Sequence, residues 1–248
     1  MDLYRHIARY LESSGHCFVH PKAVLFDMDG VLFDSMPYHV EAWLKVMERH
    51  GMPMTREEVY LNEGRTGAGT IDKLHKRYFH TPATKELIET IYQEKCQEFS
   101  VFPEPSPMPG ALELLGKVKA SGLTPVLVTG SGQRTLFERI DRDFKGFFTK
   151  DKMVTAFDVK VGKPNPEPYL MGLEKAGVKA SEAIVVENAP IGVKAGHSAG
   201  VFTVAVNTGP LKDEALLSEG ADLVYESMQA LSDGWEELLM ALMEFQKP

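Results

Sequence analysis

The stretch that decides the fold is Val24-Leu25-Phe26-Asp27-Met28-Asp29-Gly30-Val31. It begins as a short apolar run without helical periodicity and is closed by a glycine, a pattern that predicts a buried strand. Asp27 and Asp29 stand two residues apart, so on an extended backbone their side chains leave the end of the strand on the same side. Two carboxylates in such a place are electrostatically costly unless a cation or a reaction uses them. From these residues alone, a solvated acidic turn and a paired-carboxylate site both remain open.

Short apolar runs like the first recur along the chain and alternate with segments of helical periodicity, such as residues 111–120. Alternation of this kind predicts an α/β fold, a doubly wound parallel sheet whose strands are joined by crossover helices. Ligands of such sheets bind outside the carboxyl ends of the strands, which is where Asp27 and Asp29 stand. The predicted strands are Ala23–Phe26, Pro125–Val128, Ala183–Val186, Phe202–Val206 and Leu223–Val224.

The alternation is interrupted between about residues 34 and 102, a region without strand-like runs. It reads as four helices, at about 36–51, 55–61, 70–79 and 83–100. The proline-rich stretch Phe102–Pro109 and the short stretch Phe33–Pro37 would connect this region to the rest. We therefore predict an α/β core domain of residues 1–33 and 107–248 and an inserted helical cap domain of residues 34–106. Because both connectors lie beside the acids, the cap suits a lid over the site; the alternative is a helical unit that only adds stability.

Charge and composition exclude several classes of partner. The formal net charge of -8 argues against nucleic acid or an anionic membrane as the principal partner. No apolar run approaches transmembrane length. Two cysteines, Cys17 and Cys96, make no disulfide framework and have no metal-ligand spacing, so we expect a reducing cytoplasm. We also expect a monomer.

Three further stretches place polar groups where the crevice of such a sheet would collect them. Val126–Gly132 ends in Thr129-Gly130-Ser131-Gly132, whose hydroxyls and amides could bind an anionic oxygen; by itself it is also an ordinary turn. Lys163 stands directly before a helix start defined by prolines, although a lysine is commonly a surface charge. Ile184–Val186 is followed by Glu187 and Asn188, which carry the oxygen ligands that Mg²⁺ accepts.

In this order, the four stretches resemble the motifs of the haloacid dehalogenase superfamily of phosphotransferases. Asp27-x-Asp29-Gly30-Val31 is similar to the first motif, Thr129-Gly130-Ser131 to the second, Lys163-Pro164 to the third and Glu187-Asn188 to the fourth. A helical cap between the first two motifs is the arrangement of the β-phosphoglucomutase-like branch, whose core is Rossmann-like. The hinge residues 34–39 and Trp43 also fit that branch.

The resemblance implies a mechanism. Asp27 would attack phosphorus and form an aspartyl-phosphate, and Asp29 would act as the acid and base. Mg²⁺ would be held by Asp27, the main-chain carbonyl of Asp29 and the fourth motif, Glu187 and Asn188. The phosphate would be bound by Thr129, Gly130, Ser131 and Lys163. Because dehalogenases of the superfamily lack the second acid, Asp29 favours phosphoryl transfer.

The chain departs from the family pattern at two places. Asn188 stands where an acid is usual, and Glu187 would compensate directly or through water. In the cap, Gly67 aligns with the arginine that grips the distal phosphate in β-phosphoglucomutases, and Arg65 lies two residues earlier. His39 and Lys95 match cap-side substrate residues, although packing would explain both equally well.

We therefore predict first a phosphohydrolase for a small phosphorylated metabolite, possible substrates including a sugar phosphate. A phosphomutase is the second prediction. A pyrophosphatase and a weakly catalytic ligand-binding relative complete the alternatives. The sequence does not identify the substrate, because specificity depends on how cap side chains approach it when the lid closes.

Overall fold

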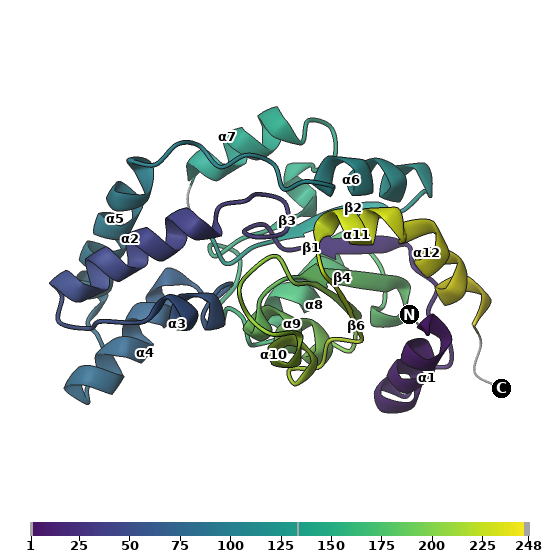
Figure 1. The fold of residues 1–248 in the computed structure, drawn as a ribbon, viewed down its shortest axis with the longest axis horizontal. Coiled ribbons are helices and arrows are strands. Elements are labelled where there is room, and N and C mark those ends of the chain that lie inside the picture. The colour runs from purple at the N-terminus through teal and green to yellow at the C-terminus, as the bar shows by residue number, and fades with distance from the viewer. Residues whose placement is uncertain (1, 133, 246–248) are drawn as a thin grey trace.

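The computed structural model describes residues 2–132 and 134–245. At its centre lies a sheet of six parallel strands in the order β3-β2-β1-β4-β5-β6 (Figure 1). The strands are β1 (Ala23–Phe26), β2 (Thr124–Val128), β3 (Met153–Val154), β4 (Ala183–Glu187), β5 (Phe202–Val206) and β6 (Leu223–Tyr225). The predicted doubly wound sheet is confirmed. The sequence does not predict β3, because a strand of 2 residues gives no recognisable apolar run.

The strands are apolar along their length because both faces of the sheet are covered. Every residue of β1, β4 and β5 is buried, as expected for a parallel sheet between two layers of helices. Side chains of β1 alternate, so that Val24 and Phe26 join one apolar cluster and Leu25 joins another. Phe26 pairs with Leu127 on one side and with Val186 on the other. The residues that follow β1, β2 and β4 therefore emerge at the same edge of the sheet.

Helices pack on both faces of the sheet. One face carries α1 (Leu3–Ser14), α6 (Ala111–Ala120), α7 (Arg134–Asp143), α11 (Met228–Asp233) and α12 (Trp235–Glu244). The other carries α8 (Glu167–Ala176) and α9 (Pro190–Ser198), and α10 (Asp213–Leu217) packs beside α9 and β6. Short 3-10 turns at Lys150–Lys152 and Ala180–Glu182 precede β3 and β4. Among the described residues, no helix combines the length and apolar character that a membrane span requires.

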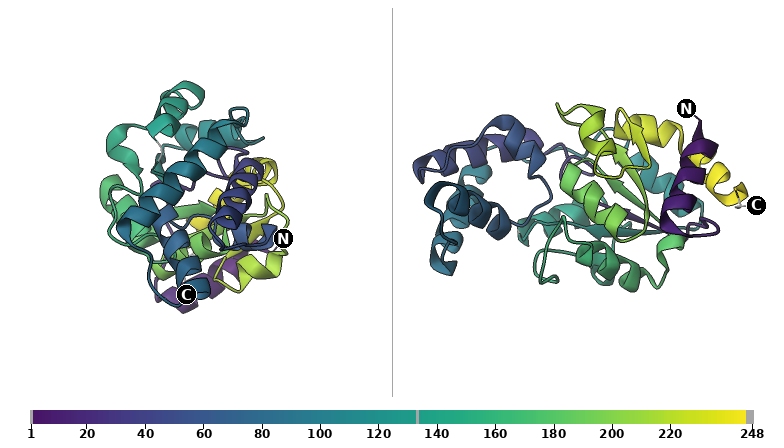
Figure 2. Two further views of the ribbon diagram at one scale, coloured as in Figure 1. Left: turned by 90° about the vertical axis from the view of Figure 1, so that its left-hand side faces the viewer. Right: turned by 90° about the horizontal axis from the view of Figure 1, so that it is seen from below.

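Four helices between β1 and α6 form the cap. They are α2 (Met36–Arg49), α3 (Arg56–Leu61), α4 (Gly67–Phe79) and α5 (Lys85–Ser100), and they share an apolar cluster of their own. Figure 2 shows the cap at one end of the molecule, beyond the carboxyl edge of the sheet. α4 begins at Gly67, earlier than predicted, because the Thr66 side chain accepts a hydrogen bond from the amide of Gly69 and caps the helix.

The two connectors between cap and core lie side by side. The amide of Asp34 donates to the carbonyl of Ser106 at 3.0 Å, and the amide of Met108 donates to the carbonyl of Leu32 at 2.7 Å. Both connectors are therefore tied together next to the end of β1. The domain boundaries at residues 33/34 and 106/107 stay a prediction, but this pairing is what a hinge between cap and core needs.

Candidate active site

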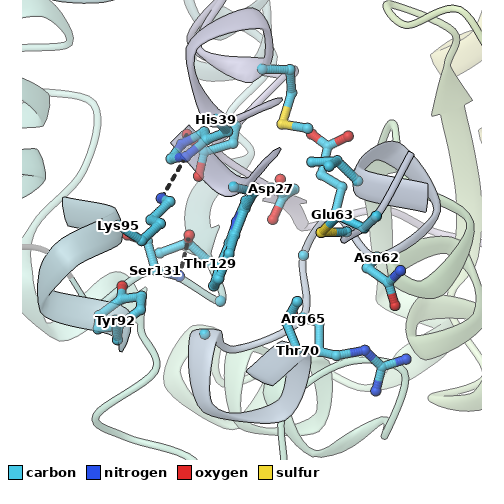
Figure 3. Close-up of a pocket in the computed structure, with 18 residues that line it drawn as sticks. Asp27, His39, Asn62, Glu63, Arg65, Thr70, Tyr92, Lys95, Thr129 and Ser131 are labelled. Carbon is cyan, nitrogen blue, oxygen red and sulfur yellow. Dashed lines mark hydrogen bonds and ion pairs between the residues drawn. The ribbon is translucent and has the colours of Figure 1, made fainter. Parts of the chain in front are cut away.

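A cavity of about 70 Å³ lies between the carboxyl edge of the sheet and the cap (Figure 3). Residues that follow β1 and β2 form its core wall: Asp27, Asp29, Thr129, Gly130 and Ser131. Cap residues form the opposite wall, among them His39, Trp43, Asn62, Glu63, Arg65, Thr70, Tyr92 and Lys95. All the residues predicted from the first two motifs therefore meet at one place. Lys163, Glu187 and Asn188 are not part of the lining and lie behind Asp27.

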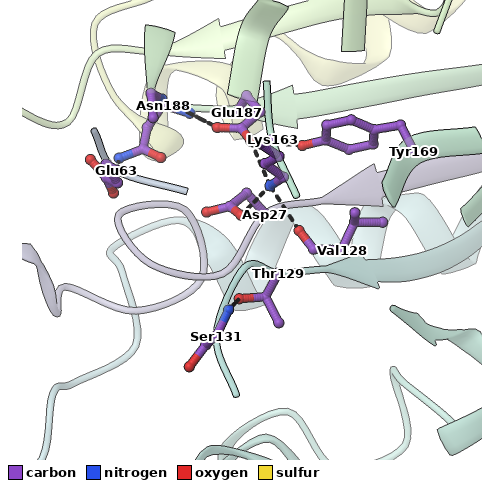
Figure 4. Close-up of polar contacts among 10 residues, drawn as sticks. Asp27, Glu63, Val128, Thr129, Ser131, Lys163, Tyr169, Glu187 and Asn188 are labelled. Carbon is purple, nitrogen blue, oxygen red and sulfur yellow. Dashed lines mark hydrogen bonds and ion pairs between the residues drawn. The ribbon is translucent and has the colours of Figure 1, made fainter. Parts of the chain in front are cut away.

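Lys163 holds the carboxylate of Asp27 from the protein side (Figure 4). Its Nζ donates to Oδ1 of Asp27 at 2.5 Å, to Oε1 of Glu187 at 2.7 Å and to the carbonyl of Val128 at 3.0 Å. Burial raises the pKa of Asp27 to about 7, although the neighbouring Lys163 opposes the rise. Burial also disfavours the charged ammonium, yet Asp27 and Glu187 outweigh it and raise the pKa of Lys163. The lysine is therefore a fixed cation beside the predicted nucleophile.

Glu187 supports Lys163. Its Oε1 accepts from Lys163 and from the hydroxyl of Tyr169 at 2.8 Å. Its Oε2 accepts from the amides of Asn188 at 3.0 Å and Ala189 at 3.2 Å. Both oxygens of this fully buried carboxylate are thus occupied by donors. That Glu187 contributes to Mg²⁺ binding, directly or through water, stays a prediction.

The cap supplies a carboxylate next to Asn188 that the sequence analysis missed. Asn188 Nδ2 donates to Oε1 of Glu63 at 2.8 Å, and both side chains are buried. Burial raises the pKa of Glu63 well above its usual value, with Asn188 opposing and Asp27 and Asp29 adding to the rise. The sequence contained one signal for this residue: Glu63 is an acid in the cap loop, and the fourth motif of the chain lacks its usual acid at Asn188.

The oxygen atoms around Asp27 fit a magnesium ion. Oδ1 of Asn188 is buried without a hydrogen-bond partner, an unsatisfied acceptor that calls for an explanation. Lys163 occupies only one oxygen of Asp27. The described residues contain no group of three or more histidine, cysteine or acidic side chains in metal-binding geometry. Mg²⁺ needs only one or two carboxylates beside neutral oxygens and water, so this set suits Mg²⁺ better than a metal that requires an all-protein cage.

Asp29 is held by a chain of contacts that runs into the cap. Its Oδ1 accepts from Oγ of Ser35 at 2.5 Å and lies 3.1 Å from Nε2 of His39. On the other side of the ring, Nζ of Lys95 lies 2.7 Å from Nδ1 of His39, as Figure 3 shows. With an ammonium at Nδ1, the histidine donates through Nε2 to Asp29. Burial opposes ionisation of Asp29, but His39, Ser35 and Lys95 outweigh it and lower its pKa to about 2. The structure thus brings His39 and Lys95, both predicted, to the second acid.

The loop after β2 presents hydroxyls to the cavity. The Thr129 amide donates to the carbonyl of Val154 at 2.9 Å and so continues the sheet, while its Oγ1 accepts from the amide of Ser131 at 3.0 Å. This contact bends the chain so that Thr129, Gly130 and Ser131 all line the cavity. Their place opposite the cap is what a phosphate-binding loop requires.

Arg65 lies on the other side of the cavity from His39 and Lys95 (Figure 3). Among the described residues its guanidinium has no hydrogen bond or ion pair, its Nε is buried without a partner, and burial lowers its pKa. Its neighbours on α3 and α4 are paired: Arg56 with Glu41, Lys76 with Asp72 and Arg77 with Glu58. Lys73, whose pKa is lowered by burial and by Arg65, donates to Oδ1 of Asn62 at 2.8 Å. Arg65 is therefore a cation without a counter-ion at the cavity wall.

Comparison with known proteins identifies the family of this fold and site. The family model described as haloacid dehalogenase-like hydrolase matches residues 21–200. The chain belongs to this family. Its motifs and cap place it in the β-phosphoglucomutase-like branch, and the family makes it an enzyme.

Several relatives of this chain are named as phosphatases of small compounds. The chain is 34% identical over 218 residues to a phosphorylated carbohydrates phosphatase of Thermotoga maritima, with 81% of this chain and 92% of the relative covered. It is 30% identical over 211 residues to hexitol phosphatase A of Escherichia coli, covering 85% and 93%. A solved structure from Bacteroides vulgatus, provisionally named a β-phosphoglucomutase, has 54% identity and a TM-score of 0.94 over 98% of each chain. The family therefore supports phosphoryl chemistry at this cavity.

Proposed function

We propose that this haloacid dehalogenase-like enzyme is a Mg²⁺-dependent phosphohydrolase of small phosphorylated compounds that works through an aspartyl-phosphate. The observation that carries the proposal is the division of labour between two carboxylates at the end of β1. Lys163 holds Asp27 at 2.5 Å, while Ser35 and His39 hold Asp29 at 2.5 and 3.1 Å. One acid is fixed by a buried cation, and the other is connected to groups that exchange protons.

In the first step the free oxygen of Asp27 forms a bond to phosphorus, and the bond from phosphorus to the leaving oxygen breaks. Asp29 gives its proton to that oxygen. A bound phosphoryl dianion raises the pKa of a nearby carboxyl group, which offsets the low value of Asp29 in the free enzyme. In the second step Asp29 takes a proton from water, whose oxygen attacks phosphorus and releases Asp27 and inorganic phosphate.

Mg²⁺, when bound, supplies positive charge for the equatorial phosphoryl oxygens. We propose that it is held by Asp27, the main-chain carbonyl of Asp29 and Oδ1 of Asn188, with Glu63 nearby. The protein contributes Lys163, which screens the repulsion between Asp27 and the incoming dianion. Thr129, Gly130 and Ser131 bind phosphate oxygens and orient phosphorus towards Asp27.

Hydrolysis is favoured over the mutase reaction because a mutase must retain a second phosphate group. The residue aligned with the distal-phosphate arginine is Gly67. Arg65 runs along the first turn of α4, where its Cγ and Cδ would lie 3.1 and 3.4 Å from a Cβ on Gly69. We propose that Arg65 pairs with a negative charge on the leaving group of the substrate. This contact raises the affinity for the substrate but does not hold a second phosphate group in place, as a mutase must.

A second candidate substrate is pyrophosphate, and the size of the cavity favours it. The cavity of about 70 Å³ has room for roughly five water positions. Such a space suits a compact bis-anion better than a hexose phosphate, whereas the phosphatases among the relatives favour the sugar phosphate. Both belong to the same reaction class.

A metal and substrate screen with release of free phosphate as the readout tests the proposal. We expect turnover with Mg²⁺, none with EDTA, none for Asp27→Asn, and acid-stable phosphate on Asp27 in a single turnover. Glucose 6-phosphate formed from β-glucose 1-phosphate and catalytic glucose 1,6-bisphosphate would instead establish the mutase. Metal-independent binding that survives Asp27→Asn, without turnover, would replace the enzyme by a ligand-binding protein. A cytoplasmic location and a monomeric state are part of the proposal.

A further inference from the structure

The cap segment 60–66 rests on four glycines of the core, here called the docking glycines: Gly30, Gly130, Gly162 and Gly209. They belong to the loops that follow β1, β2, β3 and β5. A Cβ on Gly130 would overlap the carbonyl oxygen of Gly64, and one on Gly162 would lie 2.6 Å from Cγ2 of Thr66. A Cβ on Gly209 would lie 3.3 Å from the ring of Tyr60. At Gly130, Gly162 and Gly209 the backbone of the core therefore meets the cap directly, whereas a Cβ on Gly30 would first meet Nδ2 of Asn188 and then Oε1 of Glu63, at 2.9 Å.

Backbone conformation does not account for three of these glycines. Gly30 has a φ of +79°, a region that favours glycine whatever lies around it. Gly130, Gly162 and Gly209 lie outside the left-handed region, so an L residue could adopt their conformations. What an added methyl group would meet at these positions is the cap. The closed arrangement of the two parts thus gives a reason for the missing side chains.

We infer that the docking glycines, above all Gly162 beneath Thr66, determine how far the cap closes. With the cap closed as far as it is in the structure, Glu63 forms a hydrogen bond with Asn188. A Cβ on Gly64 would then be 3.3 Å from Cδ of Lys163. Gly162 is thus a positioning residue, which acts on the chemistry through the cap loop. The inference rests on the proposed function in one respect, namely that the closed state is the reactive one.

Thr66 divides two tasks between its two γ atoms, which makes the contact testable. Its hydroxyl accepts from the amide of Gly69 at 3.2 Å and caps α4. Its methyl Cγ2 is the atom that faces Gly162. Serine keeps the hydroxyl and lacks the methyl. Gly162→Ala therefore adds a methyl group at the place where Thr66→Ser removes one.

Gly162→Ala, Thr66→Ser and the double variant are compared with wild type. Gly116→Ala is the matched control, because a Cβ on this glycine of α6 would meet nothing within 4 Å. Closure is read from acrylamide quenching of Trp43, which lines the cavity, whereas Trp235 is fully buried in the core. A Trp235→Phe background isolates the Trp43 signal. Phosphate release is measured in parallel on the substrate found by the screen.

We expect Gly162→Ala to increase the quenching constant of Trp43 and to lower kcat/KM at least about tenfold, because forcing a methyl group into a packed contact shifts an equilibrium by one or more powers of ten. The added Thr66→Ser should restore both quantities to within about threefold of wild type, since the double variant carries the original number of methyl groups at the contact. Thr66→Ser alone and Gly116→Ala should leave the quenching constant unchanged.

Unchanged quenching in Gly162→Ala overturns the inference. Failure of Thr66→Ser to restore closure also overturns it, because the damage would then come from the adjacent Lys163. If Gly162→Ala does not fold, Gly209→Ala takes its place. A quenching constant of Trp43 in Gly209→Ala that equals the wild-type constant would then overturn the inference. Absence of phosphate release by the wild type would defeat the proposed function alone, since the quenching comparison needs no turnover.

Discussion

Replacing Lys163 by methionine removes a cation on which two buried carboxylates depend. The ammonium lies 2.5 Å from Asp27 and 2.7 Å from Glu187, and all three side chains are almost entirely excluded from solvent. Breaking a buried pair by removing one partner costs about 3–5 kcal/mol, because the remaining charge has lost its compensation. Lys163 compensates the charge of two buried carboxylates. We therefore expect a loss of unfolding free energy near the upper end of this range, about 5 kcal/mol. Methionine nearly matches the volume of the lysine stem, which keeps the cavity contribution small.

The loss should depend on pH in a defined direction. Burial already raises the pKa of Asp27 to about 7 with the lysine present, and removal of the lysine raises it further. An acid whose folded pKa exceeds its unfolded value destabilises the fold once the pH rises above the unfolded pKa. Protonation of Asp27 at low pH therefore relieves part of the damage. The difference in stability between wild type and Lys163→Met should shrink as the pH falls from 8 to 5.

Urea unfolding of both proteins at pH 5 and pH 8 measures this difference. Lys194→Met is the control, because Lys194 is half exposed and pairs with Glu219 at 3.0 Å on the surface; a loss below about 1 kcal/mol is expected there. An equal loss for Lys163→Met at both pH values, or a loss no larger than that of the control, would refute the electrostatic account of this lysine.

Three further predictions concern other parts of the molecule. Asn188→Asp puts a full charge in place of an amide dipole, so calorimetry should show Mg²⁺ binding about tenfold tighter; an unchanged affinity would remove Asn188 from the metal site. Arg65→Gln should raise KM about tenfold for substrates with a charged leaving group but not for p-nitrophenyl phosphate, with the paired Lys76→Gln as a neutral control, and equal effects on both substrates would contradict it. Burial raises the pKa of Asp222 to about 7, above its unfolded value, so its ionisation costs stability as the pH rises. Urea unfolding of Asp222→Asn should therefore show a gain of at most about 4 kcal/mol at pH 8 and little at pH 4, and a gain independent of pH would contradict this.

The fold was accessible from the sequence wherever burial alone determines the pattern. Strands β1, β4 and β5 lie between two layers of helices, so their residues are buried without interruption and nearly all apolar, which distinguishes them from amphipathic segments. β3 pairs with β2 through only Met153 and Val154 at the edge of the sheet. A pair of apolar residues occurs in any segment, so only the tertiary pairing distinguishes this strand.

The candidate site was accessible to the extent that it follows from strand order. Asp27, Thr129 and Asn188 each come directly after a strand of one parallel sheet, and that position brings them to one edge. Contacts between the cap and the core could not be predicted from strand order. Glu63 meets Asn188 only because four helices fold as a unit and close over the core, a geometry that spacing along the chain does not encode.

The charges that the closed structure gathers give a physical reason for a divalent cation. Four carboxylates of the described residues lie in or directly beside the cavity: Asp27, Asp29, Glu63 and Glu187. Two ammonium groups, those of Lys163 and Lys95, face them. Burial and the neighbouring Lys95 lower the pKa of the intervening His39. With Arg65 also at the cavity wall, the carboxylates still outnumber the cations, and the neighbouring Asp27 and Asp29 add to the rise that burial causes in the pKa of Glu63. The fourth motif has an amide, Asn188, in place of its usual acid, and the cap places the carboxylate of Glu63 next to that amide. The proposed magnesium site would thus draw its negative charge from both core and cap, so metal affinity should depend on closure as much as closure depends on the metal.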